Sequence, residues 1–229
     1  MSGLFNRLGS AFVAPARGGP DLRTVAPPAS GVDRRPLPPS IAMLSRPDDA
    51  MVAAGAAGLA LAARCRTSHA LVAIWGAADR PIRAPATGPA RRLAATLAAR
   101  GHDATATGRL TVVRLAGALQ EAAREADRAA AAAPEVPTAV VLAGARDAAA
   151  DALLHAQDAA LVALPAGSDD AVADLTVAGL VALGVEATVV ELPPASPPAR
   201  ALAASGAALV PPLRAPFDAA IKGLGRRDR

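Results

Sequence analysis

The sequence predicts an α/β fold with a doubly wound, mostly parallel sheet, the Rossmann-like three-layer α/β/α arrangement. Two observations carry this prediction. From Pro39 onward, short apolar or β-branched runs alternate with alanine-rich stretches of helical length. Several of the short runs, such as those around Val112 and Val140, are apolar without interruption, as strands buried on both faces are. Short links between the two kinds of segment then favour parallel strands joined by right-handed crossovers.

The expected elements follow one another along the chain from residue 40. The strands are expected at 40–45, 69–75, 109–115, 137–143, 158–164 and 185–191. The helices are expected at about 48–65, 86–100, 117–132, 146–156, 169–183 and 197–205. Ser168 is a good N-cap, while Gly101 and Gly184 follow helical runs as C-terminal stops do. The helix at 117–132 carries pairs spaced for surface ion pairs, typical of a solvated face: Glu121 with Arg124, and Glu125 with Arg128.

Two segments precede this domain. Residues 1–13 place four large apolar side chains on one helical face, which predicts a short amphipathic docking segment for a membrane surface or a partner groove: Leu4, Phe5, Leu8 and Phe12. The alternative is that this segment folds back onto the domain or has no ordered structure. Residues 14–39 hold seven prolines, three glycines and four arginines, which predicts a disordered linker. The α/β domain is expected at 40–215, and a basic C-terminal tail at 216–229.

Composition narrows the classes of function. Aromatic residues are 2% of the chain and the net charge is only +4, so stacking on single-stranded nucleic acid is not expected. The single cysteine, Cys65, gives no disulfide framework and no zinc cluster, and favours a reducing cytoplasm. The longest apolar stretch, 51–63, is shorter than the ~20 residues of a membrane span. Asn6 and Arg7 interrupt the apolar region that a signal peptide would need. The excess of Arg, Ala and Pro is typical of a GC-rich bacterial genome.

The residues that could carry chemistry do not form a recognisable motif. His69, His102 and His155 lack the spacing of metal ligands. Asp151 lies four residues before His155, a spacing that fits a surface pair better than a catalytic dyad. Trp75, at the end of the second strand, could line a pocket at the carboxyl edge of the sheet, although core packing is the commoner use. We therefore expect no catalytic, cofactor-binding or metal-binding residues and no cofactor.

The turn after the first strand is the most informative part of the chain. Residues 40–76 have the strand, turn, helix and strand that open a nucleotide-binding α/β fold. A phosphate-binding loop at this position uses glycine, free backbone N–H groups, a lysine and a Ser/Thr hydroxyl. This chain has Arg46, Pro47, Asp48 and Asp49 instead. Proline lacks an N–H, and the two carboxylates repel phosphate. A simpler interpretation is that Asp48 is only a helix cap. Both interpretations, the degenerate phosphate loop and the helix cap, predict no ATP hydrolysis at this turn.

The order of these elements resembles the MinD/ParA family of P-loop ATPases over about residues 38–215. Residues 41–45 resemble the first strand of that family, 46–52 stand at its loop, and 53–66 resemble its first helix. Residues 137–145 resemble the strand that ends in a metal-binding aspartate, but here the strand ends in Ala-Gly-Ala with no acid. Residues 148–155 and 157–165 resemble the next helix and strand. The pattern is similar above all to the degenerate CpaE/TadZ branch of the tight-adherence (Flp) pilus system.

This resemblance implies a non-catalytic pseudo-ATPase scaffold that localises or organises a membrane-associated assembly. Its partners would be proteins of that assembly, at the inner face of the cytoplasmic membrane, with peripheral membrane contact and a homodimer left open. The rival hypothesis is a small-molecule or nucleotide-binding α/β enzyme that uses an unfamiliar motif at the carboxyl edge of the sheet.

Overall fold

The computed structural model describes residues 40–77, 83–144, 159–167, 178–182 and 187–222. The docking segment at 1–13, the linker at 14–39 and the helix expected at 146–156 lie outside these residues. So do Ser168, Gly184 and most of the helix expected at 169–183. Contacts divide the chain into Met1–Arg35 and Pro36–Arg229, and everything described here belongs to the second unit.

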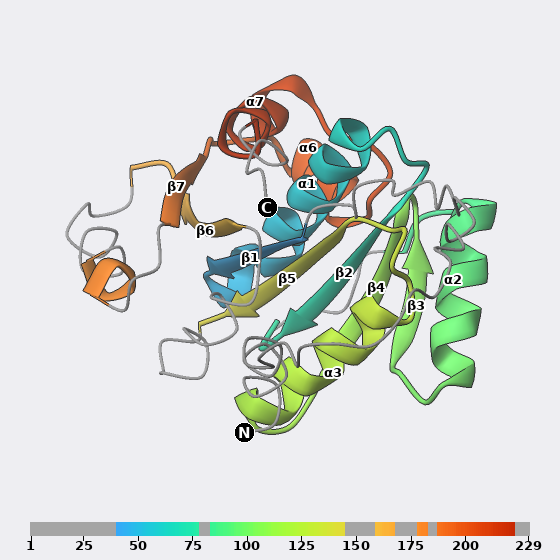
Figure 1. Ribbon diagram of the computed structural model, residues 1–229. Helices are drawn as coiled ribbons and strands as arrows, with labels where there is room; N and C mark the ends of the chain where they lie inside the picture. Colours follow the sequence, from blue (N-terminus) through green and yellow to red (C-terminus); the bar gives the residue numbers. More distant parts are fainter. Residues whose placement is uncertain (1–39, 78–82, 145–158, 168–177, 183–186, 223–229) are drawn as a thin grey trace, which may run out of the picture. The chain divides into compact units, whose positions relative to one another are not determined.

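The centre of the fold is a seven-stranded sheet with the order β3-β4-β2-β5-β1-β6-β7 (Figure 1). The strands are β1 (Ser40–Ser45), β2 (Ala70–Trp75), β3 (Ala104–Thr107), β4 (Leu110–Leu115), β5 (Thr138–Ala143), β6 (Ala159–Pro165) and β7 (Ala187–Leu192). All neighbours are parallel except β3, which pairs antiparallel with β4. The predicted α/β class with a mostly parallel sheet is confirmed, and the six predicted strands are present within two residues of their expected ends.

The path of the chain creates a switch point beside β1. Counted along the chain, the six parallel strands run in the order 3-2-4-1-5-6, because β5 lies between β1 and β2. This differs from the 3-2-1-4-5-6 order of the dinucleotide-binding fold. After β1 the chain proceeds toward β2, whereas after β5 it proceeds to β6 on the other side of β1. The carboxyl ends of β1 and β5 therefore mark the crevice where open α/β sheets usually bind ligands.

Helices cover both faces of the sheet. One face carries α1 (Ala50–Arg64), α6 (Pro197–Ala204) and α7 (Pro211–Ala220), as Figure 1 shows. The other face carries α3 (Leu119–Ala131), and α2 (Gly88–Ala99) packs against β3 and β4. The predicted helices at 48–65, 86–100, 117–132 and 197–205 are confirmed. Residues 50–62 of α1 are all buried, since the helix has no polar side chain there and lies between the sheet and α6.

Two elements were not predicted. The short strand β3 has the sequence Ala-Thr-Ala-Thr, which carries too little apolar signal. Helix α7 begins with two prolines and contains Pro216, so its sequence indicates a loop, although proline is tolerated in a first helical turn. The domain end expected at residue 215 falls inside α7. Phe217 is fully buried in the core and Ile221 is 1% exposed, so residues 216–221 belong to the domain rather than to a tail.

Candidate functional site

The switch point is occupied by the turn that links β1 to α1. A single 3-10 turn, η2 (Pro47–Asp49), follows β1 and leads directly into α1. Arg46, Pro47 and Asp48 are exposed there, while Asp49 is 8% exposed and is the N-cap residue of α1. The four residues that sequence analysis placed at the degenerate phosphate loop therefore lie where a phosphate would approach the helix.

The backbone N–H groups at this turn donate hydrogen bonds to carbonyl groups of the turn itself rather than pointing to solvent. The Asp49 N–H donates to the Arg46 carbonyl at 3.1 Å, and the Ala50 N–H donates to the Pro47 carbonyl. Pro47 has no N–H to offer. A phosphate site at a helix N-terminus needs several free N–H groups that point at one place. Here the 3-10 turn consumes two of them and proline removes a third.

An ion pair sits at the N-terminus of α1. Arg200, in the first turn of α6, donates from Nη2 to Asp49 Oδ1 at 2.5 Å. The Asp49 side chain is 11% exposed and that of Arg200 is 34% exposed, so the pair is partly shielded from water. The carboxylate supplies the negative charge that the helix dipole favours at this end. The pair therefore places a carboxylate and its counter-ion beside the N-terminus of α1.

The expected helix cap takes a different form. The N-cap residues are Arg46 for η2 and Asp49 for α1, not Asp48, and neither makes a side-chain hydrogen bond to the backbone of its helix. Asp49 points instead to Arg200, because α6 brings a guanidinium group within reach. Sequence reasoning missed Arg200, since 151 residues separate it from Asp49 and no local pattern marks it.

Close packing leaves little room beside the turn. Gly144 follows β5 with φ of 73°, and a Cβ there would lie 3.4 Å from Cγ of Pro47. Gly76 follows β2, also with φ of 73°, and a Cβ there would lie 2.6 Å from the Ala143 carbonyl oxygen. The ends of β1, β2 and β5 are thus drawn together by two glycines in the left-handed region, which other residues rarely adopt.

Trp75 serves packing at the other side of this edge. Its ring contacts the core cluster on the α3 face, and Nε1 donates to the Gly117 carbonyl at 3.1 Å. The hydrogen bond ties the end of β2 to the loop before α3. This arrangement agrees with the interpretation of Trp75 as a packing residue.

The remaining titratable candidates are dispersed. His69 lies just before β2, where burial and the nearby Arg92 lower its pKa, and Ser68 Oγ is 3.2 Å from its Nδ1. His102 pairs with Glu125, which also pairs with Arg128 at 2.5 Å, as the spacing predicted. Burial raises the pKa of the Cys65 thiol. Asp151 and His155 lie outside the described residues. Within the described ranges, no three His, Cys, Asp or Glu side chains are grouped to hold a metal ion.

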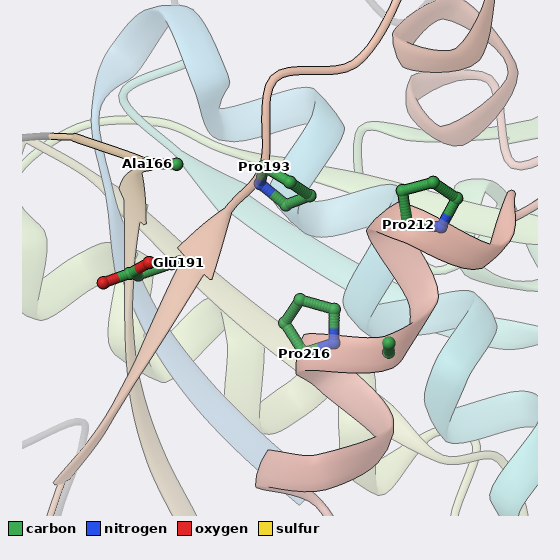
Figure 2. Close-up of a pocket in the computed structure, with 6 residues that line it drawn as sticks. Ala166, Glu191, Pro193, Pro212 and Pro216 are labelled. Atoms are coloured by element: carbon green, nitrogen blue, oxygen red, sulfur yellow. The ribbon is translucent and has the colours of Figure 1, made fainter.

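A hollow lies between β7 and α7. It is lined mostly by apolar side chains, three of them prolines, and the lining residues are Ala166, Glu191, Pro193, Pro212, Ala215 and Pro216 (Figure 2). Among these described lining residues, Glu191 is the only charged one and none is cationic. The described lining therefore offers no group that would hold a phosphate.

The comparisons with known proteins do not identify a family. No family model matches the chain, and neither a curated protein nor a solved structure does. Among the helices that the structure describes, none is long and apolar enough to cross a membrane.

Proposed function

We propose that the chain is a non-catalytic pseudo-ATPase scaffold that organises a protein assembly at the inner face of the cytoplasmic membrane. The observation that carries the proposal is the Asp49–Arg200 ion pair at the N-terminus of α1. It places a carboxylate and its counter-ion beside the helix N-terminus, the end that a nucleotide phosphate would approach. A fold with this site closed is suited to binding partners rather than to turning over a nucleotide.

The energetics disfavour a triphosphate at this place. Two like charges about 4 Å apart repel by roughly 1 kcal/mol in water and roughly 4 kcal/mol at an effective dielectric constant near 20. A phosphate at the start of α1 would meet the carboxylate of Asp49 and the exposed carboxylate of Asp48. It would also have to displace the hydrogen bonds that hold η2.

The resemblance to the MinD/ParA family, and to its CpaE/TadZ branch, suggests the kind of assembly. In this proposal it is a tight-adherence pilus apparatus, and residues 1–13 connect the domain to it. Full burial of a large apolar side chain contributes roughly 1.5–3 kcal/mol, so the apolar face of that segment suffices for a weak docking contact. The segment carries one arginine, which adds little attraction to anionic lipid, so a protein groove is favoured over bare membrane.

Two measurements test the proposal. The full chain with Mg²⁺ and ATP should release phosphate no faster than a buffer control, and Asp48→Ala should leave that rate unchanged. Turnover that Asp48→Ala abolishes would refute the non-catalytic assignment.

Replacing Phe5 and Phe12 with serine should disperse a fluorescent fusion from its place in the cell, whereas Leu22→Ser with Val25→Ser, in the linker, should not. If the Phe5/Phe12 variant changes neither localisation nor liposome co-sedimentation, the docking role is wrong.

A further inference from the structure

Among the described residues, β7 forms an edge of the sheet whose backbone pairs with β6 alone. Helix α7 packs against β7, as α2 does against β3 at the other edge, but no described strand lies on the outer side of β7. Open edges present a row of unpaired N–H and C=O groups to any other strand. The edge of β7 is therefore a place where a further strand could be added.

The direction of the backbone groups on β7 follows from its pairing. The Ala166 N–H donates to the Leu192 carbonyl at 2.8 Å, so the polar groups of Leu192 face β6. Backbone groups of successive strand residues alternate in direction. Val190 and Thr188 therefore also face β6, while Glu191, Val189 and Ala187 direct their N–H and C=O groups away from the sheet.

The open edge has little protection. Natural edge strands are guarded by lysine, proline, bulges or short length, yet β7 has six residues, Ala-Thr-Val-Val-Glu-Leu, with a single charge. The Val189 side chain is 40% exposed. Among the described residues, the other large apolar side chains that are exposed are Val181 and Leu202. An apolar side chain thus sits at the middle of the outward-facing backbone groups.

We propose that β7 pairs antiparallel with β7 of a second copy of this chain, on a two-fold axis through Val189. In this register Val189 lies opposite its own counterpart, and Ala187 lies opposite Glu191 of the other copy. All three outward-facing residues then exchange hydrogen bonds. A shift by two residues in either direction would leave one of them opposite Pro193, which has no N–H, or opposite a residue beyond the strand.

The chemistry of this strand favours a second copy over an unrelated strand. A two-fold axis makes one patch complementary to itself, and here it places the exposed valines side by side. No like charges lie directly opposite each other, because each Glu191 faces an alanine. The proline-lined hollow borders the same edge at Glu191 and Pro193 (Figure 2). Pairing along one short strand buries less area than a standard stable interface, so the dimer should form reversibly with concentration.

Cysteine crosslinking of the full chain tests the register. With Cys65→Ala removing the native thiol, Val189→Cys is compared with Thr188→Cys, which is also exposed. Hydrogen-bonded antiparallel partners have Cα atoms about 5.5 Å apart, within the range that a disulfide spans. Thr188 would be displaced about 7 Å along the strand from its counterpart, in addition to the strand spacing, and would be too far. Mild oxidation should convert the Val189→Cys chain to dimer about tenfold faster than the Thr188→Cys chain.

Sedimentation of the unmodified chain gives an independent check. The mass of the wild-type chain should rise from 22.7 kDa toward twice that value as its concentration increases. Val189→Lys should keep the chain monomeric. Val181→Lys, at an exposed valine outside the strand, should still dimerise. Equal crosslinking at positions 188 and 189 would overturn the proposal. So would a wild-type chain that stays monomeric up to about 100 µM. Because none of these readouts involves nucleotide, they are separate from the test of the proposed function.

Discussion

At the scale of the residue, Asp49 determines what the start of α1 can hold. It is the N-cap of a buried helix, and its carboxylate pairs with Arg200 rather than with the helix backbone. Removing either partner leaves the other charge poorly solvated, which costs more than the net value of the pair. The pair is therefore expected to stabilise the contact between α1 and α6.

We expect Arg200→Ala to lower the free energy of unfolding by about 1–2 kcal/mol, because Asp49 would lose its counter-ion while a third of the Arg200 side chain is already solvated. Urea unfolding measures this change. Arg214, which pairs with Asp218 at the surface, is the matched control, and Arg214→Ala should cost less than about 0.5 kcal/mol. Equal losses in the two variants would show that the Asp49–Arg200 pair has no special role.

The lowered pKa of His69 predicts that the stability of the folded chain depends on pH. Its folded-state pKa is lowered by burial and by Arg92, so between about pH 7 and 5 the unfolded chain binds more protons at this residue than the folded chain does. The stability contribution of the neutral ring is present above the unfolded pKa and is lost as the pH falls. The wild-type Tm should therefore drop more than that of His69→Gln between pH 7 and 5. Parallel Tm curves would contradict this prediction.

At the scale of the element, the close approach of α1 and α6 depends on a small residue. A Cβ at Gly55 would overlap the carbonyl oxygen of Ala203 on α6. Alanine is favoured over glycine within a helix by about 1 kcal/mol, yet here the backbone of a neighbouring helix would have to move. The position of α6, and with it that of Arg200, follows from this contact.

We expect Gly55→Ala to destabilise the chain by about 1–3 kcal/mol, because the overlap outweighs the gain in helix propensity. Gly88, at the start of α2, is the control, because a Cβ there would meet only the end of the Arg92 side chain at 3.5 Å. Gly88→Ala should be neutral or slightly stabilising. Thermal unfolding of the two variants decides the question, and a stable Gly55→Ala chain would show that α6 can move at little cost.

The elements also show where sequence reasoning succeeds. The parallel strands were predictable because burial on both faces leaves an uninterrupted apolar run, as in β5. Strand β3 and helix α7 were not, since their stability comes from contacts made elsewhere in the chain. In α7, Leu213 and Phe217 enter the core that lies under α1 and β7, and only that burial offsets the prolines. The Asp49–Arg200 pair escaped prediction for the same reason.

At the scale of the whole molecule, the fold class follows from the pattern but the strand order does not. Alternating strands and helices predict parallel pairing, whereas the insertion of β5 between β1 and β2 is set by tertiary packing. That insertion places the turn at 46–49 at the switch point. The turn and its two carboxylates can be read from the sequence, whereas its place beside β5 and the pairing of Asp49 with Arg200 are visible only in the fold.

We expect the domain to fold without the segments that precede it. Residues 14–39 have little apolar surface to offset the entropy of ordering them. Deleting residues 1–38 should therefore leave the Tm within a few degrees of that of the full chain, as measured by circular dichroism. A large loss would show that the N-terminal residues contribute to the core.

In the proposed function, the protein itself closes the N-terminus of α1 to nucleotide. Isothermal titration of the full chain with ATP and Mg²⁺ tests this closure most directly. We predict no saturable heat up to millimolar ATP, because the hydrogen-bonded turn, Asp48 and the Asp49–Arg200 pair all oppose a phosphate. Any binding of ATP would then have a free energy weaker than about −4 kcal/mol. Saturation at micromolar ATP would contradict the account.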